Sequence, residues 1–305
     1  DSALTALDVS NWNTSKVTSN RASLYGDSGV SQLAVRNSVK GANTDMTTMF
    51  SGDTGLTTLD VSNWNTSNVT NMNQMFYMPT AGTSHLTTLD VSKWDTSKVT
   101  DMHGMFYQNE LLSEISVGGW DTSNVTDMAY MFYDDTAVKV LDVGGWDTRN
   151  VTTMRSMFYM IDSGTSNLVA LDLSSFDMSK VTDAKFMLRY DGSIKTLKLG
   201  TNTYLITSTG NAYVPTISTT DSAYTGKWVG LTTGNVYTSA QLMTAYSYLT
   251  KSGVADTYVW QTVDGSTTLE AKDTDDLIAG TDTTWSPSDN FVSGTDANGN
   301  ALTVS

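Results

Sequence analysis

The amino-acid sequence repeats itself at a nearly fixed interval, and this periodicity constrains the fold more than any other feature. The segment LDVSNWNTSNVTNMNQMFY at residues 59–77 returns as LDVSKWDTSKVTDMHGMFY at residues 89–107. Its leading apolar position recurs every 26 or 30 residues, at Leu7, Leu33, Leu59, Leu89, Ile115, Leu141, Leu171 and Leu197. Such periods are typical of arrays in which each unit buries its apolar face only against its neighbours. We therefore expect one continuous stack of about eight repeats over residues 1–205.

Within one repeat the apolar residues change their spacing. Leu59 and Val61 alternate with polar neighbours, as in a strand with one buried face. The two methionines and the phenylalanine of residues 72–76 fall at positions i, i+3 and i+4, which share one face of a helix, and Thr70 is an acceptable N-cap. The pattern predicts one strand and one short helix in each repeat. The recurring apolar residues are expected to point inward and to stack on their own copies.

The repeated LDVSxWxTSxVTxMxxMFY motif resembles the BspA-type leucine-rich repeats of bacterial surface proteins, in their 26-residue form. The resemblance covers roughly residues 1–205. It implies an α/β solenoid, a right-handed stack of parallel strands with short helices, on a secreted protein attached to the cell wall of a Gram-positive bacterium. The usual role of that family is adhesion to host mucus, matrix or other microbes.

The sequence changes character after the repeats. Residues 206–262 predict a strand and turn in GKWVGLTTGNVYTS, an amphipathic helix over 239–250 with Ser239 as its cap, and a strand over 256–261. We expect a small α+β module that caps the last repeat, because an open end of an array needs a polar cover. An independent ligand-binding module is the alternative. Residues 263–305 resemble the start of a bacterial immunoglobulin-like stalk repeat, or form a linker.

Charge and composition exclude several classes of partner. The chain carries 17 Lys and Arg against 32 Asp and Glu, a net charge of -15, which disfavours nucleic acid and anionic membranes. No stretch approaches the roughly 20 apolar residues of a membrane span, so we expect no membrane insertion. The absence of cysteine excludes a disulfide framework. Because the sequence starts at Asp1 without a signal peptide, we interpret it as a fragment that lacks its targeting and anchor segments.

Groups suited to catalysis are scarce in this sequence. His85 and His103 are the only histidines, and neither lies in a pattern typical of a zinc site or a serine triad. The proximity of Asp101 to His103 is attributed to chance. We therefore expect a protein that is not an enzyme and that has no cofactor, with Ca²⁺ as the one metal ion to consider.

Two columns of aspartates run along the expected stack. The outward strand positions include Asp60, Asp90, Asp142 and Asp172. Neighbouring strands lie about 4.8 Å apart, so two adjacent carboxylates cost about 1–3 kcal/mol. Water and Ser or Thr hydroxyls would compensate, or alternatively a divalent cation or a basic or hydroxyl-rich ligand. The second column alternates between Asp and Asn, which indicates an uncharged role in Asx turns: Asn13, Asn65, Asp95, Asp121, Asp147 and Asp177.

A column of tyrosines follows the expected helical turn, at Tyr77, Tyr107, Tyr133 and Tyr159. Such a column suits carbohydrate stacking or a flat protein partner, and it suits equally the margin of the core. Together with the outward aspartates, these tyrosines are the candidate ligand-binding residues. The sequence favours a cell-surface adhesin that binds host mucus, a matrix glycoprotein or a glycan. The alternative is a structural spacer that holds another domain away from the cell wall.

Overall fold

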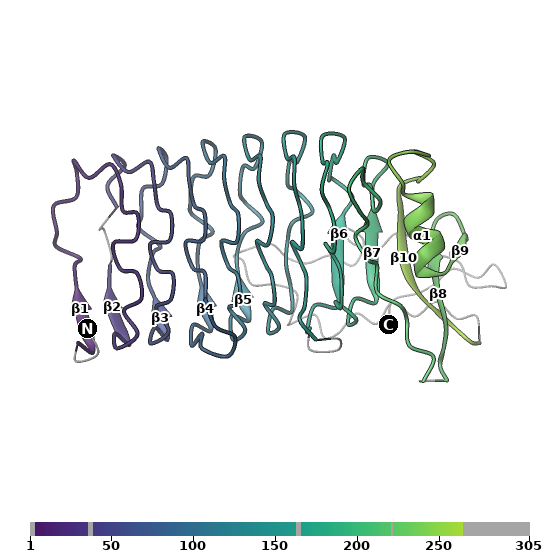
Figure 1. Ribbon diagram of the computed structural model, residues 1–305, viewed down its shortest axis with the longest axis horizontal. Coiled ribbons are helices and arrows are strands. Elements are labelled where there is room, and N and C mark those ends of the chain that lie inside the picture. The colour runs from purple at the N-terminus through teal and green to yellow at the C-terminus, as the bar shows by residue number, and fades with distance from the viewer. Residues whose placement is uncertain (1–3, 36–38, 163–165, 221, 265–305) are drawn as a thin grey trace, which may run out of the picture.

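The computed structural model of the chain describes residues 4–35, 39–162, 166–220 and 222–264. Figure 1 shows successive turns of the chain lying side by side along the long axis, with a small C-terminal unit at one end. The short strands lie on one side of this row. No helix of the described residues is long and apolar enough to cross a membrane.

Each strand of the repeats is short and pairs in parallel with the equivalent strand of a neighbouring repeat. The pairing joins equivalent residues, so Leu7 faces Leu33 and Leu171 faces Leu197. The strands fall into a sheet of β1 (Ala6–Asp8), β2 (Gln32–Ala34) and β3 (Thr58–Leu59), a pair of β4 (Thr88–Leu89) and β5 (Glu114–Ile115), and the neighbours β6 (Ala170–Leu173) and β7 (Thr196–Leu199). Isolated parallel bridges continue the alignment on another side, joining Asn71 to Asp101 and Asp101 to Asp127.

The prediction of an α/β solenoid is wrong. The described residues of the repeats contain no helix, and the chain is mostly β, in small open sheets. The expected helical turn fails because one residue inside it lies in the left-handed region. Across the repeats these residues are Ala22, Thr48, Gln74, Gly104, Tyr130, Ser156 and Phe186, with φ between 51° and 66°. A residue in this conformation ends a right-handed helix.

Backbone hydrogen bonds explain why the chain prefers this arrangement. In the segment predicted as a helix, Met75 N–H donates to Met72 C=O, three residues back, at 3.3 Å. The adjacent Phe76 N–H donates instead to Met105 C=O of the next repeat, at 2.9 Å. Donors thus alternate between a local turn and a neighbouring repeat. A helix of one turn is only marginally stable in isolation. In this arrangement, half of the backbone N–H groups of the segment instead donate to carbonyls of the neighbouring repeat.

The prediction that the recurring apolar residues face inward is confirmed. Indole rings stack in one column at centroid distances of 5.9, 6.4 and 6.2 Å, formed by Trp64, Trp94, Trp120 and Trp146. A parallel column of phenylalanines has spacings of 5.4 to 5.9 Å, formed by Phe50, Phe76, Phe106, Phe132 and Phe158. Each of the four indoles also donates its Nε1–H to a valine carbonyl of the preceding repeat, as Trp120 does to Val91 at 3.0 Å. The core is therefore continuous from repeat to repeat.

The C-terminal unit is joined to the last repeat by strand pairing. Strand β10 (Asp256–Thr262) lies antiparallel to β7 and, on its other side, to β8 (Tyr224–Gly230), and β9 (Val236–Tyr237) completes the five-stranded sheet. The predicted strand over 256–261 is confirmed as β10. The edge of the last repeat's strand is thereby paired, as Figure 1 shows beside β7. The domain boundaries at 205 and 262 stay predictions, and residues 265–305 lie outside the described residues.

The one helix of the described residues, α1 (Ser239–Ala245), differs from the sequence prediction at both ends. Thr238 is the N-cap, and its side chain accepts a hydrogen bond from Gln241 N–H, so Ser239 is the first helical residue. Ser239 instead accepts from the buried Trp228 indole at 3.1 Å. The helix does not continue to residue 250, because the backbone of Tyr246 turns to accept from Leu205 N–H at 2.8 Å.

The left-handed residues give a test of this backbone arrangement. Thr48 has φ of 52°, a conformation that is unfavourable for a β-branched residue by about 1 kcal/mol or more. We expect Thr48→Gly to raise the melting temperature in a thermal unfolding experiment, because glycine adopts this φ without a steric cost. The control is Thr57→Gly, at an exposed position with an ordinary φ, which should lower the melting temperature. A lower melting temperature for Thr48→Gly would contradict the left-handed assignment.

Candidate ligand-binding surfaces

The four tyrosines that the sequence predicts as candidate ligand-binding residues form one stacked column. Successive ring centroids of Tyr77, Tyr107, Tyr133 and Tyr159 are 4.6, 4.4 and 4.8 Å apart. Each ring is half-buried. Burial raises the pKa of Tyr107 and of Tyr133, so both phenols stay protonated. Tyr107 and Tyr133 each stack between two neighbouring rings. The column therefore presents ring edges and hydroxyls to solvent more than open ring faces.

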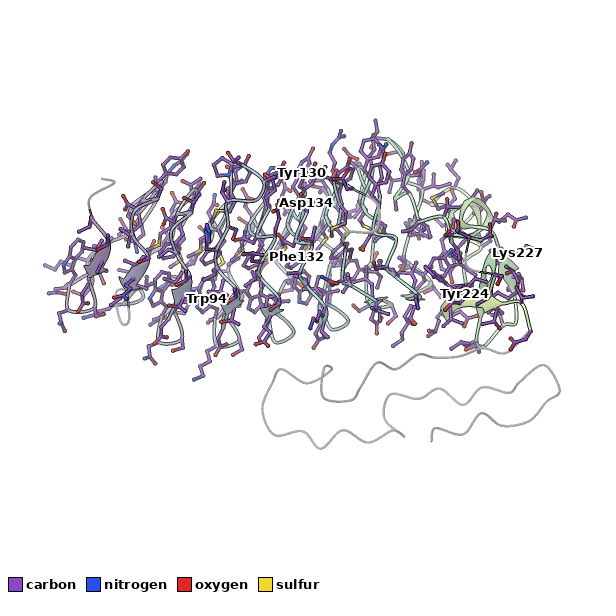
Figure 2. The ribbon with its side chains drawn as sticks, turned by 90° about the horizontal axis from the view of Figure 1, so that it is seen from below. Trp94, Tyr130, Phe132, Asp134, Tyr224 and Lys227 are labelled. Atoms are coloured by element: carbon purple, nitrogen blue, oxygen red, sulfur yellow. The ribbon has the colours of Figure 1, made fainter. Side chains whose placement is uncertain are left out.

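The column of tyrosines is bounded by other residue types. The equivalent position is Ser51 in the preceding repeat and Arg189 in the following one. Tyr130 stands beside the column, 5.9 Å from Tyr133 between ring centroids. Figure 2 shows Tyr130 toward one margin of the molecule and Phe132 in its interior.

The outward aspartates of the strands are engaged by neighbouring serines. Asp60 Oδ1 accepts from the hydroxyl of Ser62 at 2.7 Å, and Asp90 Oδ1 accepts from that of Ser92 at 2.6 Å. Asp172 accepts from Ser174 and also forms an ion pair with Lys198 at 2.9 Å. Serine hydroxyls and one lysine therefore compensate part of the negative charge of this column. This agrees with the interpretation in which hydroxyl groups, and not a bound cation, stabilise the adjacent carboxylates.

A shallow groove of about 580 Å³ follows this strand face. Its lining includes Thr58, Asp60, Ser62, Thr88 and Asp90. The groove offers carboxylates and hydroxyls, which suit the hydroxyl groups of a sugar. Asp142 lies farther along the same column and does not line this groove.

The residues that the structure describes do not form a cluster of metal ligands. In the described part of the chain, no group of three or more His, Asp or Glu side chains is placed to hold a metal ion. The second aspartate column confirms the Asx-turn prediction, because Asp95 and Asp121 each accept from the N–H two residues ahead, at 3.0 Å. Asn65 does the same at 3.2 Å. This explains why asparagine substitutes there for aspartate.

Polar pairs between neighbouring repeats form a feature that sequence reasoning missed. In four repeats the side chain two residues after the bridge position meets the bridge residue of the next repeat. Thr47 donates to Asn71 at 3.0 Å, Asn73 to Asp101 at 3.2 Å, and Arg155 to Asp183 at 3.2 Å, while His103 Nδ1 lies 3.5 Å from Asp127. The hydrogen bond to Asp127 raises the pKa of His103. His103 thus has a structural partner, and it is Asp127 rather than the nearby Asp101.

A column of buried carboxyls is a second missed feature. Asp53, Asn109, Asp135 and Asp191 occupy one equivalent position, and all are buried. Burial raises the pKa of Asp53 and of Asp191 to about 7, and that of Asp135 well above its usual range. The signal in the sequence is an Asp or Asn three residues before a recurring apolar residue, such as Leu56 or Leu112.

Comparison with known families decides the relationship of the repeats. A family model described as "Mycoplasma protein of unknown function, DUF285" matches residues 2–87 and 79–198. The chain belongs to the DUF285 family. Comparison with curated proteins and with solved structures gives no match. The assignment to the BspA-type leucine-rich repeats is therefore wrong, in agreement with the absence of helices from the described DUF285 repeats.

Membership in DUF285 places the candidate surfaces within the family region. The tyrosine column and the outward aspartates lie between residues 60 and 172, inside the matched segments. The C-terminal unit with α1 lies beyond residue 198 and so outside the match. The surfaces described here are therefore surfaces of the DUF285 repeats themselves.

The buried carboxyl column makes stability depend on pH. Because the pKa of Asp53 is about 7 in the folded chain and about 3.8 in an unfolded one, folding binds a proton between these values. The stabilisation that this proton uptake by Asp53 contributes is fully present below about pH 4 and is lost as the pH rises through about 7. We expect Asp53→Asn to raise the free energy of unfolding at pH 8 by roughly 2–4 kcal/mol, with little change at pH 4.

Denaturant unfolding at the two pH values measures this effect. The chain supplies its own precedent for the substitution, because Asn109 occupies the same position and donates to Phe76 C=O of the preceding repeat at 2.8 Å. The control is Asp60→Asn at an exposed strand position, which should leave the pH dependence near that of the wild type. An equal effect of Asp53→Asn at both pH values would contradict a raised pKa.

Proposed function

We propose that this chain is a non-enzymatic adhesin of a bacterial cell surface, and that it binds host mucus, a matrix glycoprotein or a glycan through the outward columns of its repeats. The observation that carries the proposal is the tyrosine column, in which four rings recur at 4.4 to 4.8 Å along one side of the stack. Repeated weak contacts along one rigid surface give avidity without a deep pocket.

The chemistry of the exposed columns favours a hydroxyl-rich partner. Stacked tyrosines offer phenol groups that donate and accept hydrogen bonds, and the groove beside Asp60 and Asp90 offers carboxylates and hydroxyls that accept from sugar hydroxyls. The net charge of -15 disfavours nucleic acid as a partner and gives no attraction to anionic membranes. A host glycoprotein or another surface protein that carries glycans fits these groups.

A spacer is the second candidate function. It is favoured by the continuity of the core, in which aromatic columns and backbone hydrogen bonds cross between repeats without a flexible joint in residues 39–162. A chain of this kind would hold another domain away from the cell wall and would need no ligand of its own. Binding measurements separate the two functions.

The tyrosine column is tested by replacing its hydroxyls together. We expect the variant with Tyr77, Tyr107, Tyr133 and Tyr159 changed to Phe to keep its fold, because phenylalanine preserves the stacked rings. Binding to a glycan and mucin array should fall at least tenfold, since four repeated hydrogen-bonding groups are lost. The control changes Tyr237 and Tyr258 of the C-terminal unit to Phe. Unchanged binding of the fourfold variant would reject the column, and no binding by the wild type would favour the spacer.

Calcium is tested by thermal unfolding. Because the outward aspartates already accept from serines, we propose that recognition needs no Ca²⁺ and expect no shift in melting temperature at millimolar CaCl₂. A site occupied at 100 times its dissociation constant would add about 2.7 kcal/mol of stability. A calcium-dependent rise that Asp60→Asn and Asp90→Asn abolish would establish a metal site at this face.

A further inference from the structure

A cluster of cations and aromatic rings follows the end of the tyrosine column. We call it the Phe186 cluster, and it consists of Arg155, Lys185, Phe186, Arg189, Tyr190 and Tyr213. Lys185 Nζ lies 4.7 Å from the centre of the Phe186 ring. The Arg189 guanidinium lies 4.9 Å from the same ring and 4.5 Å from that of Tyr190. Three cations thus gather in an acidic protein.

Two of these cations lack a carboxylate partner. Arg155 forms an ion pair with Asp183 and donates to the Tyr130 hydroxyl at 2.9 Å. Within the described ranges, Lys185 and Arg189 have no ion pair with Asp or Glu, and the side chain of Arg189 donates to the Tyr190 hydroxyl at 2.6 Å. The cluster therefore presents positive charge that the protein does not neutralise itself.

The fold does not require aromatic residues at these positions. Phe186 stands at the left-handed position that Gly104, Ser156 and Gln74 occupy in other repeats. Tyr190 stands at a second left-handed position, which Gln108 and Asp134 occupy in other repeats, so the fold does not require an aromatic side chain there either.

Tyr190 and Tyr213 of the cluster are exposed to solvent, whereas Phe186 and the rings of the tyrosine column are half-buried. Tyr190 is 37% exposed and Tyr213 is 42% exposed. Phe186 lies 5.1 Å from Tyr213 at a tilt of 47°, so these rings do not stack face to face. Flat aromatic surface beside a guanidinium is thus available to a ligand.

We propose that the Phe186 cluster binds an anionic saccharide, a sugar that carries a carboxylate or a sulfate. Arg189 and Lys185 would contact the anionic group, since a guanidinium pairs with two oxygens of one carboxylate or sulfate. Tyr190 and Tyr213 would support the C–H face of the sugar ring. The proposal rests on the adhesin function above and names the ligand class of one of its surfaces.

An acidic peptide is a weaker match to this cluster. Acidic peptide motifs are recognised by clusters of several arginines, and other peptides by backbone pairing to a strand edge or by apolar pockets. Here Arg155 is already paired with Asp183, so Arg189 is the one arginine of the cluster left for a ligand. None of the strands in the described residues includes a residue of the cluster, so no strand edge is offered to a peptide there. Open rings beside a compact positive charge instead match a small ring with one anionic group.

The test compares sialyllactose with lactose on the full chain, each as an immobilised multivalent conjugate. We expect the wild type to bind sialyllactose at least tenfold more tightly, and binding should weaken as NaCl rises. The double variant Lys185→Gln, Arg189→Gln should lose this preference and keep its melting temperature. The matched control Lys16→Gln, Lys93→Gln makes the same change of net charge at exposed lysines and should retain it. A heparin-derived oligosaccharide, which carries sulfates beside its carboxylates, serves as the sulfated probe.

The outcomes separate this inference from the proposed function. Equal binding of sialyllactose and lactose, with no tighter binding of the heparin oligosaccharide, would overturn the cluster but leave the adhesin intact. Anionic preference that survives in the Lys185 and Arg189 variant would also overturn the cluster. Binding of an aspartate-rich peptide in place of these sugars would overturn the saccharide class. A wild type that binds no glycan or mucin at all would overturn both proposals.

Discussion

Hydrogen bonds between neighbouring repeats hold this structure together, because no repeat satisfies its own backbone. In the segment around Met72, every second N–H donates to the next repeat, as Gln74 does to His103 at 2.8 Å. Buried backbone groups without partners are costly, so a repeat separated from its neighbours would lose these bonds and expose its core together. The repeat is therefore a unit of sequence and not a unit of stability.

The same alignment that satisfies the backbone also creates the surfaces. Because equivalent residues lie beside one another, an inward tryptophan becomes a stacked indole column and an outward tyrosine becomes a stacked phenol column. A side chain that occurs once per repeat thus acts as a line of groups. A repeat that has a different residue at such a position changes the surface there. Arg189 replaces the tyrosine at the position where the tyrosine column ends and the Phe186 cluster begins.

Sequence reasoning could find the inward residues but not the backbone that carries them. Spacing of Met72, Met75 and Phe76 at i, i+3 and i+4 is the same for a helix and for a turn that contains a left-handed residue. The left-handed φ of Gln74 and the hydrogen bond from Phe76 N–H to Met105 C=O distinguish the two. The Asx turns were predictable because Asp and Asn exchange at Asn65 and Asp95.

Partners across repeats were not predictable in the same way. The pKa of Asp53 depends on burial that no single repeat reveals, and the Phe186 cluster joins residues from Arg155 to Tyr213. Such groups meet only when the register of 26 or 30 residues is applied to polar positions as well as apolar ones. The net charge of -15 disfavours anionic ligands for the chain as a whole, whereas Lys185 and Arg189 place positive charge at one site.

The polar pairs between repeats limit how such a gene can change its length. Inward residues are nearly identical from repeat to repeat, so recombination could delete one copy without harm to the core. The polar pairs at the new junction between repeats would change, however. Arg155 forms a hydrogen-bonded ion pair with Asp183, whereas the bridge residue opposite the Ala129 repeat is the neutral Thr153. Loss of the intervening copy would set Ala129 against Asp183 and leave that carboxylate without its arginine. Neighbouring copies are therefore matched in their polar residues, and a crossover that removes one copy changes these pairs as well as the length of the stack.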